Sequence, residues 1–130
     1  MGRVAGLSQR HVHNMSPCPP KPNCVSSLNT EGRRLVAPLQ FTGSAEAARS
    51  RLLDVLGSLK GAHIIISDGD YIHAEFVSSL FKFTDDVEFL IDESTQTIQL
   101  KSASRAGSYD FGVNRKRVNL IRDLYNVRKK

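Results

Sequence analysis

The stretch from Asp86 to Lys101 decides the fold, and its sequence is DVEFLIDESTQTIQLK. On both sides of the polar centre DESTQ, apolar residues alternate with polar ones, which is typical of two half-buried strands joined by a turn. Folding the stretch back on itself pairs Phe89 with Leu100 on one face and Glu88 with Lys101 on the other. Because apolar residues then meet apolar ones and an acid meets a base, the pattern predicts the register of an antiparallel hairpin.

Two further strands are predicted before this hairpin. The apolar run Ile64-Ile65-Ile66 predicts a strand that is covered on both faces. Asp68-Gly69-Asp70 predicts a tight turn, and alternation resumes directly after it. The four expected strands are therefore Ala62–Ser67, Tyr71–Phe81, Asp86–Ile91 and Thr97–Ser104.

Helical patterns lie on either side of the strands. Apolar residues at helical spacing predict a helix over about Ala45–Leu59, with Ser44 as its cap and Gly61 after its end. A second helix is predicted over about Val113–Val127. The order α-β-β-β-β-α with short links predicts an α+β fold, in which a four-stranded antiparallel meander carries two helices packed on one face.

The chain divides into an arm and a domain. Residues 1–34 are rich in proline and lack apolar periodicity, so we expect an extended arm, followed by a single domain over 35–130. A length of 130 residues with 40% hydrophobic and 24% charged content fits one ordinary globular domain. Because no run approaches about 20 apolar residues and no signal peptide is visible, we expect a cytoplasmic protein without a membrane span.

The net charge of +5 is unevenly distributed. Residues 1–34 carry +4, residues 35–113 carry −5, and residues 114–130 carry +6. A basic tail favours contact with nucleic acid or anionic lipid. This tail, however, begins inside a predicted helix that should pack on the core, so we expect a solvated helix face and no nucleic-acid partner.

The cysteines Cys18 and Cys24 admit three interpretations. They are free thiols in a reducing compartment, or they form a disulfide in an oxidising one. The third option is a zinc site that also uses His11 and His13, although that spacing fits no common zinc knuckle. In each case the proline-flanked loop should bring the two sulfurs close enough to bridge.

The clearest candidate site is the junction of the last strand with the last helix. Small hydroxyls, two arginines and free amides at a helix start suit a phosphate or carboxylate. The expected anion-binding residues are Ser102, Ser104, Arg105, Asp110, Asn114 and Arg115, with His73 and Glu75 on the adjoining sheet face. The structural alternative is that Asp110 or Asn114 caps the helix, while the arginines pair with Asp85 and Asp86.

The open sheet face offers a second possibility. His73 and Glu75 fall on one strand face, where a carboxylate would raise the basicity of the imidazole and make a general-base pair. Cross-strand ion pairs explain the same residues without catalysis. Asp85, Asp86 and Glu88 are acidic enough to attract a metal, but alternation points Asp85 away from the other two.

No nucleotide-binding, zinc-binding or nucleophile motif is present in the sequence. We therefore expect no cofactor and no metal, and we favour a non-enzymatic binding or interaction module with a small anionic ligand or a protein as its partner. The alternative function is a small hydrolase-like enzyme that uses the His73–Glu75 pair.

Several blocks together carry a family resemblance. They are CPPKPNCVSS at 18–27, DGDYIHAEF at 68–76, FTDDVEF at 83–89, SASR at 102–105 and GVNR at 112–115. In these blocks the chain resembles the bacterial and plant family called domain of unknown function 1499. The resemblance implies no settled activity and supplies no catalytic residue. It also implies that relatives are often membrane-tethered or lumenal, which leaves the compartment open.

Overall fold

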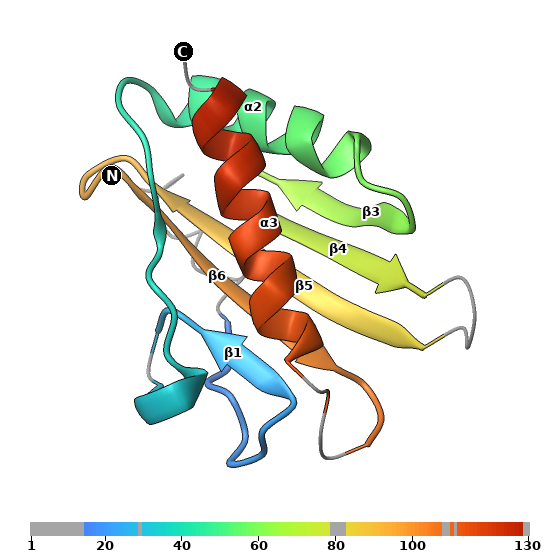
Figure 1. The fold of residues 1–130 in the computed structure, drawn as a ribbon. Coiled ribbons are helices and arrows are strands. Elements are labelled where there is room, and N and C mark those ends of the chain that lie inside the picture. The colour runs from blue at the N-terminus through green and yellow to red at the C-terminus, as the bar shows by residue number, and fades with distance from the viewer. Residues whose placement is uncertain (1–14, 29, 79–82, 108–109, 111, 129–130) are drawn as a thin grey trace.

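The computed structural model describes residues 15–28, 30–78, 83–107, 110 and 112–128. Within these residues the chain forms an α+β fold, with one antiparallel sheet and two α-helices (Figure 1). The helices are α2 (Ala45–Gly57), α3 (Val113–Arg128) and the short 3-10 helix η2 (Gly32–Arg34). The strands are β1 (Cys24–Ser26), β2 (Leu39–Gln40), β3 (Ala62–Asp68), β4 (Tyr71–Val77), β5 (Thr84–Asp92) and β6 (Thr97–Ser104).

The sheet contains the predicted meander and two additional strands. Its order is β1-β6-β5-β4-β3, with β2 pairing separately with β6. Phe89 lies opposite Leu100 and Glu88 lies opposite Lys101, so the hairpin register is confirmed. The expected count of four strands is wrong, because β1 and β2 also pair with β6. Both are only two or three residues long, and pairing with a distant strand is what makes them strands.

The core lies between the sheet and both helices, which cover the same face (Figure 1). Phe89 and Leu100 of the sheet are fully buried, as are Leu52 of α2 and Ile121 of α3. Each such side chain contributes roughly 1.5–3 kcal/mol to folding. Ser44 caps α2 as predicted, since its hydroxyl accepts a hydrogen bond from an amide in the first turn.

The prediction that the isoleucine run is covered on both faces is wrong. Ile64, Ile65 and Ile66 are 40%, 49% and 37% exposed. β3 is the first strand of the meander and lies at the end of the sheet order, so it pairs only with β4 among the described strands. An apolar run has the same sequence pattern in a central and in an edge strand, and only the strand order separates the two.

Gly61 is required by the close approach of two strands. Its φ is +85°, and a Cβ at this position would lie 2.7 Å from the carbonyl oxygen of Val77. The amide of Val77 also donates a hydrogen bond to the carbonyl of Gly61 over 2.9 Å. Gly61 therefore has a packing role at the start of β3, whereas the residue that caps the end of the helix is Ser58 and not the expected Gly61. The helix itself ends at Gly57, two residues before the expected Leu59.

Two expectations lie partly outside the described residues. His11 and His13 of the zinc hypothesis belong to the undescribed N-terminal segment. β4 ends at Val77, so it is shorter than the predicted Tyr71–Phe81, and residues 79–81 of that predicted range lie outside the described residues.

Candidate functional site

Four of the predicted site residues meet at the junction of β6 with α3, where they bond to one another. Asn114 is fully buried, and its Oδ1 accepts hydrogen bonds from Ser102 Oγ over 2.6 Å and Arg117 Nη1 over 2.9 Å. Its Nδ2 donates to Ser104 Oγ over 2.9 Å and to Asp110 Oδ2 over 2.7 Å. These residues therefore form a buried polar hub that joins strand to helix.

The amides at the start of α3 are occupied by Asp110. Its carboxylate accepts hydrogen bonds from the amide of Gly112 over 2.8 Å and from the amide of Asn114 over 3.1 Å. Burial raises the pKa of Asp110, but these bonds and the one from the Asn114 side chain outweigh it, so the pKa lies below its ordinary value. Asp110 is the helix cap that the structural alternative describes.

The hub also holds the N-terminal segment. Asn114 Nδ2 donates to the carbonyl of Asn23 over 3.1 Å, and Asn23 Nδ2 donates to the carbonyl of Gly107 over 2.6 Å. Asn23 directly precedes β1, which pairs antiparallel with β6. The segment expected as an extended arm is thus joined to the sheet from residue 23 onward by side-chain and backbone bonds.

Arg105 lies away from the hub, on the sheet face opposite the helices. Its guanidinium makes paired hydrogen bonds to Asp86 over 2.8 and 2.9 Å and an ion pair with Glu75. His73 Nε2 lies 2.8 Å from Asp86 Oδ1. The hydrogen bond from Arg105 lowers the pKa of Asp86, burial opposes it, and the bond with His73 adds to the lowering. His73 therefore pairs with Asp86, and Glu75 pairs with Arg105.

A second group on the same face confirms the predicted cross-strand contact. Lys101 Nζ lies 3.9 Å from Glu88 Oε1, and the hydroxyl of Tyr71 donates to Glu88. Burial, followed by the hydrogen bond with Glu88, raises the pKa of Tyr71. The charged groups of this face are engaged with one another across β4, β5 and β6.

The acidic residues at the start of β5 point to opposite faces, as alternation predicts. Asp85 is buried on the helix side and lies 2.8 Å from Arg117 of α3. The guanidinium of Arg117 also lies 4.8 Å from the ring centroid of Phe76. The partner of Asp85 is therefore Arg117, and not Arg105 or Arg115 as the sequence suggested. No group of three metal-ligating side chains occurs among the described residues.

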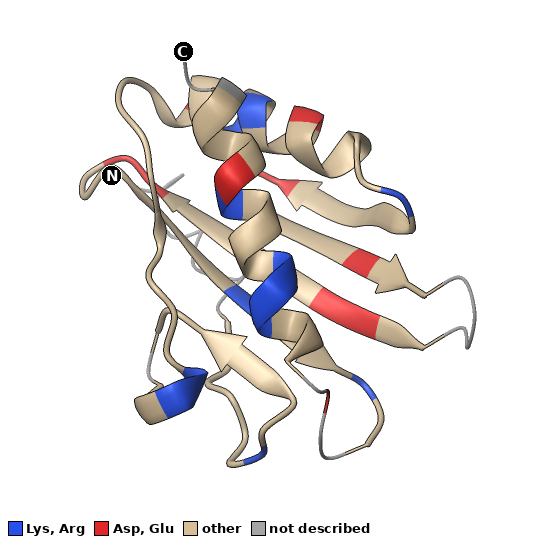
Figure 2. Ribbon diagram, viewed as in Figure 1, with Lys and Arg blue, Asp and Glu red and all other residues tan. Residues whose placement is uncertain are grey.

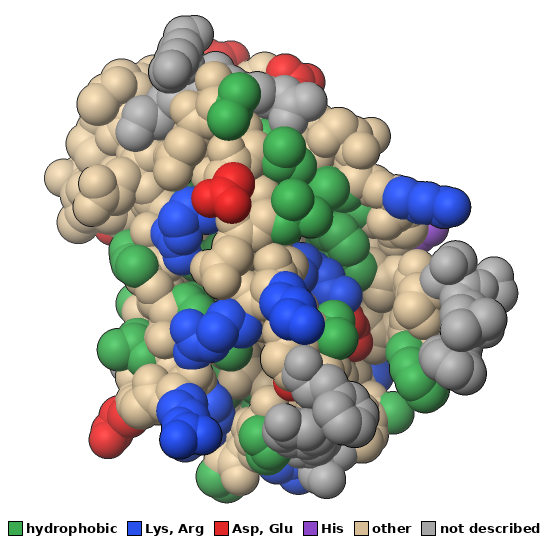
Figure 3. Space-filling view, in the orientation of Figure 1, with side chains coloured by type: hydrophobic (Ala, Val, Ile, Leu, Met, Phe, Trp, Pro, Cys, Tyr) green, Lys and Arg blue, Asp and Glu red, His purple; other side chains and the backbone are tan. Residues whose placement is uncertain are grey.

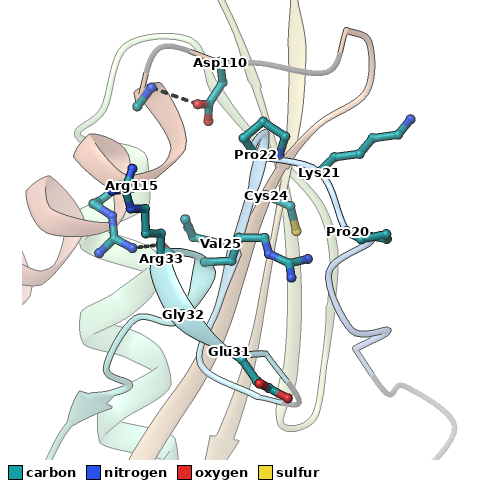
Figure 4. Close-up of a pocket in the computed structure, with 12 residues that line it drawn as sticks. Pro20, Lys21, Pro22, Cys24, Val25, Glu31, Gly32, Arg33, Asp110 and Arg115 are labelled. Carbon is teal, nitrogen blue, oxygen red and sulfur yellow. Dashed lines mark hydrogen bonds between the residues drawn. The ribbon is translucent and has the colours of Figure 1, made fainter.

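A hollow of about 650 Å³ lies beside the hub, between η2, the start of α3 and the segment before β1 (Figure 4). Its walls are Pro20, Lys21, Pro22, Cys24, Val25, Glu31, Gly32, Arg33, Arg34, Asp110, Gly112 and Arg115. Two of the predicted site residues, Asp110 and Arg115, belong to this wall. Four of the lining residues are basic and two are acidic, so the wall is net positive.

Two arginines of the wall, Arg34 and Arg115, are held by backbone carbonyls. Arg34 Nη1 donates to the carbonyl of Pro19 over 2.6 Å. Arg115 Nη2 donates to the carbonyls of Arg33 and Leu35, and the first of these bonds is drawn in Figure 4. Within the described chain neither guanidinium makes an ion pair, so their positive charges are not neutralised by a carboxylate.

Basic and acidic residues predominate on different elements. Lys and Arg occur along α3, which also carries Asp123, and at η2, while acidic residues lie on β4 and β5 (Figure 2). The surface view shows the basic side chains gathered over α3 and η2 (Figure 3). Among the described residues, the basic side chains of η2 and of α3 therefore lie on the same side of the molecule.

Comparison with protein families gave a match over most of the chain. The family model described as Protein of unknown function (DUF1499) matches residues 14–124. The chain belongs to the DUF1499 family. No match was found among curated proteins, and none among solved structures.

In this DUF1499 chain, a disulfide joins Cys18 and Cys24, with 5.7 Å between their Cα atoms. The bridge closes the loop that supplies Pro20, Lys21 and Pro22 to the wall of the hollow. Neither helix of the described DUF1499 chain is long and apolar enough to cross a membrane.

Sequence analysis did not identify Lys21, Arg33 and Arg34 as site residues. The adjacent pair Arg33-Arg34 and the +4 charge of residues 1–34 were a usable signal. Their position on the same wall as Arg115 could not be predicted, because they precede it by 81 to 94 residues in the chain.

Proposed function

We propose that the chain is a non-enzymatic binding module that holds a small oxyanion, such as phosphate or a phosphate ester, in the hollow beside α3. The observation that carries this proposal is the pair Arg34 and Arg115, whose guanidiniums face the hollow and bond only to carbonyls among the described residues. A guanidinium fixed by carbonyls retains further N–H donors for an anion.

The other lining residues fit the same ligand class. Lys21 and Arg33 are exposed and make no side-chain hydrogen bond or ion pair with another described residue. Of the two lining carboxylates, Asp110 is engaged with the helix amides and Glu31 is exposed. A volume of about 650 Å³ lies within the range of about 300–1,000 Å³ that is usual for small-molecule sites.

This proposal moves the anion site predicted from sequence. Asp110 and Arg115 remain at its edge, while Ser102, Ser104 and Asn114 form the hub beneath it. Arg105, His73 and Glu75 belong to the opposite sheet face and are not part of the proposed site.

Calorimetric titration with inorganic phosphate, sulfate and pyrophosphate tests the proposal. Arg115→Gln should weaken binding about tenfold or more, because a charged hydrogen bond is worth roughly 1.5–3 kcal/mol. Arg122→Gln is the matched control. Arg122 also lies on α3 and donates to two carbonyls, those of Ala37 and Pro38, but it is not part of the wall. Failure of the native chain to bind any of the three anions, or equal losses in both variants, would rule the proposal out.

One observation favours the alternative, a small hydrolase-like enzyme. His73 lies 2.8 Å from Asp86, which is a distance that orients an imidazole as a general base. The carboxylate in this pair is Asp86 in place of Glu75, and it is shared with Arg105. Hydrolysis of a panel of ester and phosphoester substrates that is lost in His73→Gln and retained in Arg115→Gln would favour the enzyme over the binding module.

A further inference from the structure

The hollow beside α3 is much larger than an inorganic anion. Its volume is about 650 Å³. At roughly 30 Å³ for each water, such a space holds on the order of 20 waters, and a phosphate ion would displace only a few of them. A ligand that fills the hollow therefore carries an organic group in addition to its anionic group.

The segment over residues 19–22 gives the hollow a wall without backbone hydrogen-bond donors. Pro19, Pro20 and Pro22 have no amide N–H, and the amide of Lys21 donates to the carbonyl of Pro19 over 2.7 Å. Pro20 and Pro22 are exposed and both line the hollow (Figure 4). An anion finds no free amide along this segment, whereas an apolar group can lie against the two proline rings.

This proline wall is fixed in position before any ligand binds. The disulfide between Cys18 and Cys24 closes the loop that contains it, and Asn23 Nδ2 donates to the carbonyl of Gly107 over 2.6 Å. A surface that is already ordered loses little conformational freedom on binding. Arg34 Nη1 also donates to the carbonyl of Pro19 over 2.6 Å. This bond places a guanidinium directly beside the prolines, so one ligand can contact both.

On the basis of the proposed anion site, we propose that its ligand is a phosphate monoester of an aromatic group. The phosphate binds at Arg34 and Arg115, and the aromatic ring lies on Pro20 and Pro22. Proline faces and aromatic rings are complementary surfaces in the recognition of proline-rich segments. A phosphate without a ring leaves the two prolines in water, and a ring without a phosphate leaves the guanidiniums without an anion.

Calorimetric titration with inorganic phosphate, methyl phosphate and phenyl phosphate tests this inference. Phenyl phosphate should bind about tenfold more tightly than methyl phosphate, the gain expected from burying roughly 55 Å² more apolar surface. Replacing both wall prolines, by Pro20→Ala with Pro22→Ala, should remove this gain and leave the affinity for inorganic phosphate unchanged. Pro17→Ala is the matched control, because Pro17 is exposed in the same segment but is not part of the wall, and it should keep the gain.

Nuclear Overhauser effects give a readout that needs no variant. In the native chain, the ring protons of phenyl phosphate should show contacts to Pro20 and Pro22. Binding of inorganic phosphate with equal affinities for the phenyl and methyl esters would overturn this inference and leave the anion site standing. A chain that binds none of the three ligands would overturn both. A gain that survives the double proline change, or ring contacts only to other residues, would also overturn the aromatic assignment.

Discussion

Replacing Asn114 with alanine removes the centre of the buried hub between β6, α3 and the segment before β1. The side chain takes part in hydrogen bonds with Ser102, Ser104, Asp110, Arg117 and the carbonyl of Asn23. It is fully buried, so water cannot replace the lost partners. The change therefore tests whether the hub holds the three segments together.

The expected loss of stability follows from the hydrogen bonds that each partner of Asn114 keeps after the change. The carbonyl of Asn23 keeps the amide of Ser104 at 3.0 Å, and Ser102 Oγ keeps Arg117 Nη1 at 3.2 Å. The hydroxyl hydrogen of Ser102, however, loses its acceptor in a fully buried position. Leaving one buried polar group unsatisfied costs about 1–3 kcal/mol, and the other bonds are weakened as well. We expect a loss of about 3 kcal/mol, which lowers the melting temperature by roughly 10 °C.

Thermal and urea unfolding measure this loss. Asn119→Ala is the matched control, because Asn119 lies on the same helix with its side chain exposed, and its replacement should change stability by no more than about 0.5 kcal/mol. If the two variants unfold at the same temperature, the hub contributes nothing to stability and the reasoning fails.

Three other outcomes are expected. Gly61→Ala should destabilise the chain by about 1–3 kcal/mol more than Gly43→Ala. Both glycines have a positive φ, but only a Cβ at residue 61 would lie against a strand carbonyl, that of Val77. Equal losses of stability in thermal melts would contradict this. The lowered pKa of Asp110 stabilises the fold above the unfolded value of about 4, and this contribution is lost as the pH falls through the folded pKa. Asp110→Asn should therefore lower stability at pH 7 and flatten the acid side of the stability profile, and an unchanged acid slope would count against the cap. Reductant, or Cys18→Ser with Cys24→Ser, should cost about 2 kcal/mol and weaken phosphate binding, because the bridge holds one wall of the hollow; two freely alkylated thiols in native protein would refute the bridge.

The family and the local structure could be predicted from the sequence. Alternation over Asp86–Lys101 gave the hairpin register, because side chains of a strand point to opposite faces with a period of two residues. The start of α2 at Ala45 and of α3 at Val113 followed from helical spacing in the same way. These patterns depend on neighbours a few residues apart, so the chain displays them before any tertiary contact forms.

The candidate site depended on the tertiary structure. The sequence brought Ser102, Ser104, Asp110 and Asn114 together correctly, since a short link joins β6 to α3. It also assigned Arg105 to that site, but the alternation of β6 continues to Arg105 and places it, like Lys101, on the opposite face, where two carboxylates bind it.

The order of the strands determined contacts between distant residues, which a local sequence pattern cannot predict. Asn114 contacts the carbonyl of Asn23 across 91 positions, and Arg115 contacts that of Leu35 across 80. Such pairs form only because β1 adds to the free side of β6, which brings the N-terminal segment beside α3. The same order leaves β3 at the other edge with its isoleucines exposed. Local periodicity determines which residues face inward on each element, and the placement of the elements determines which of those faces meet.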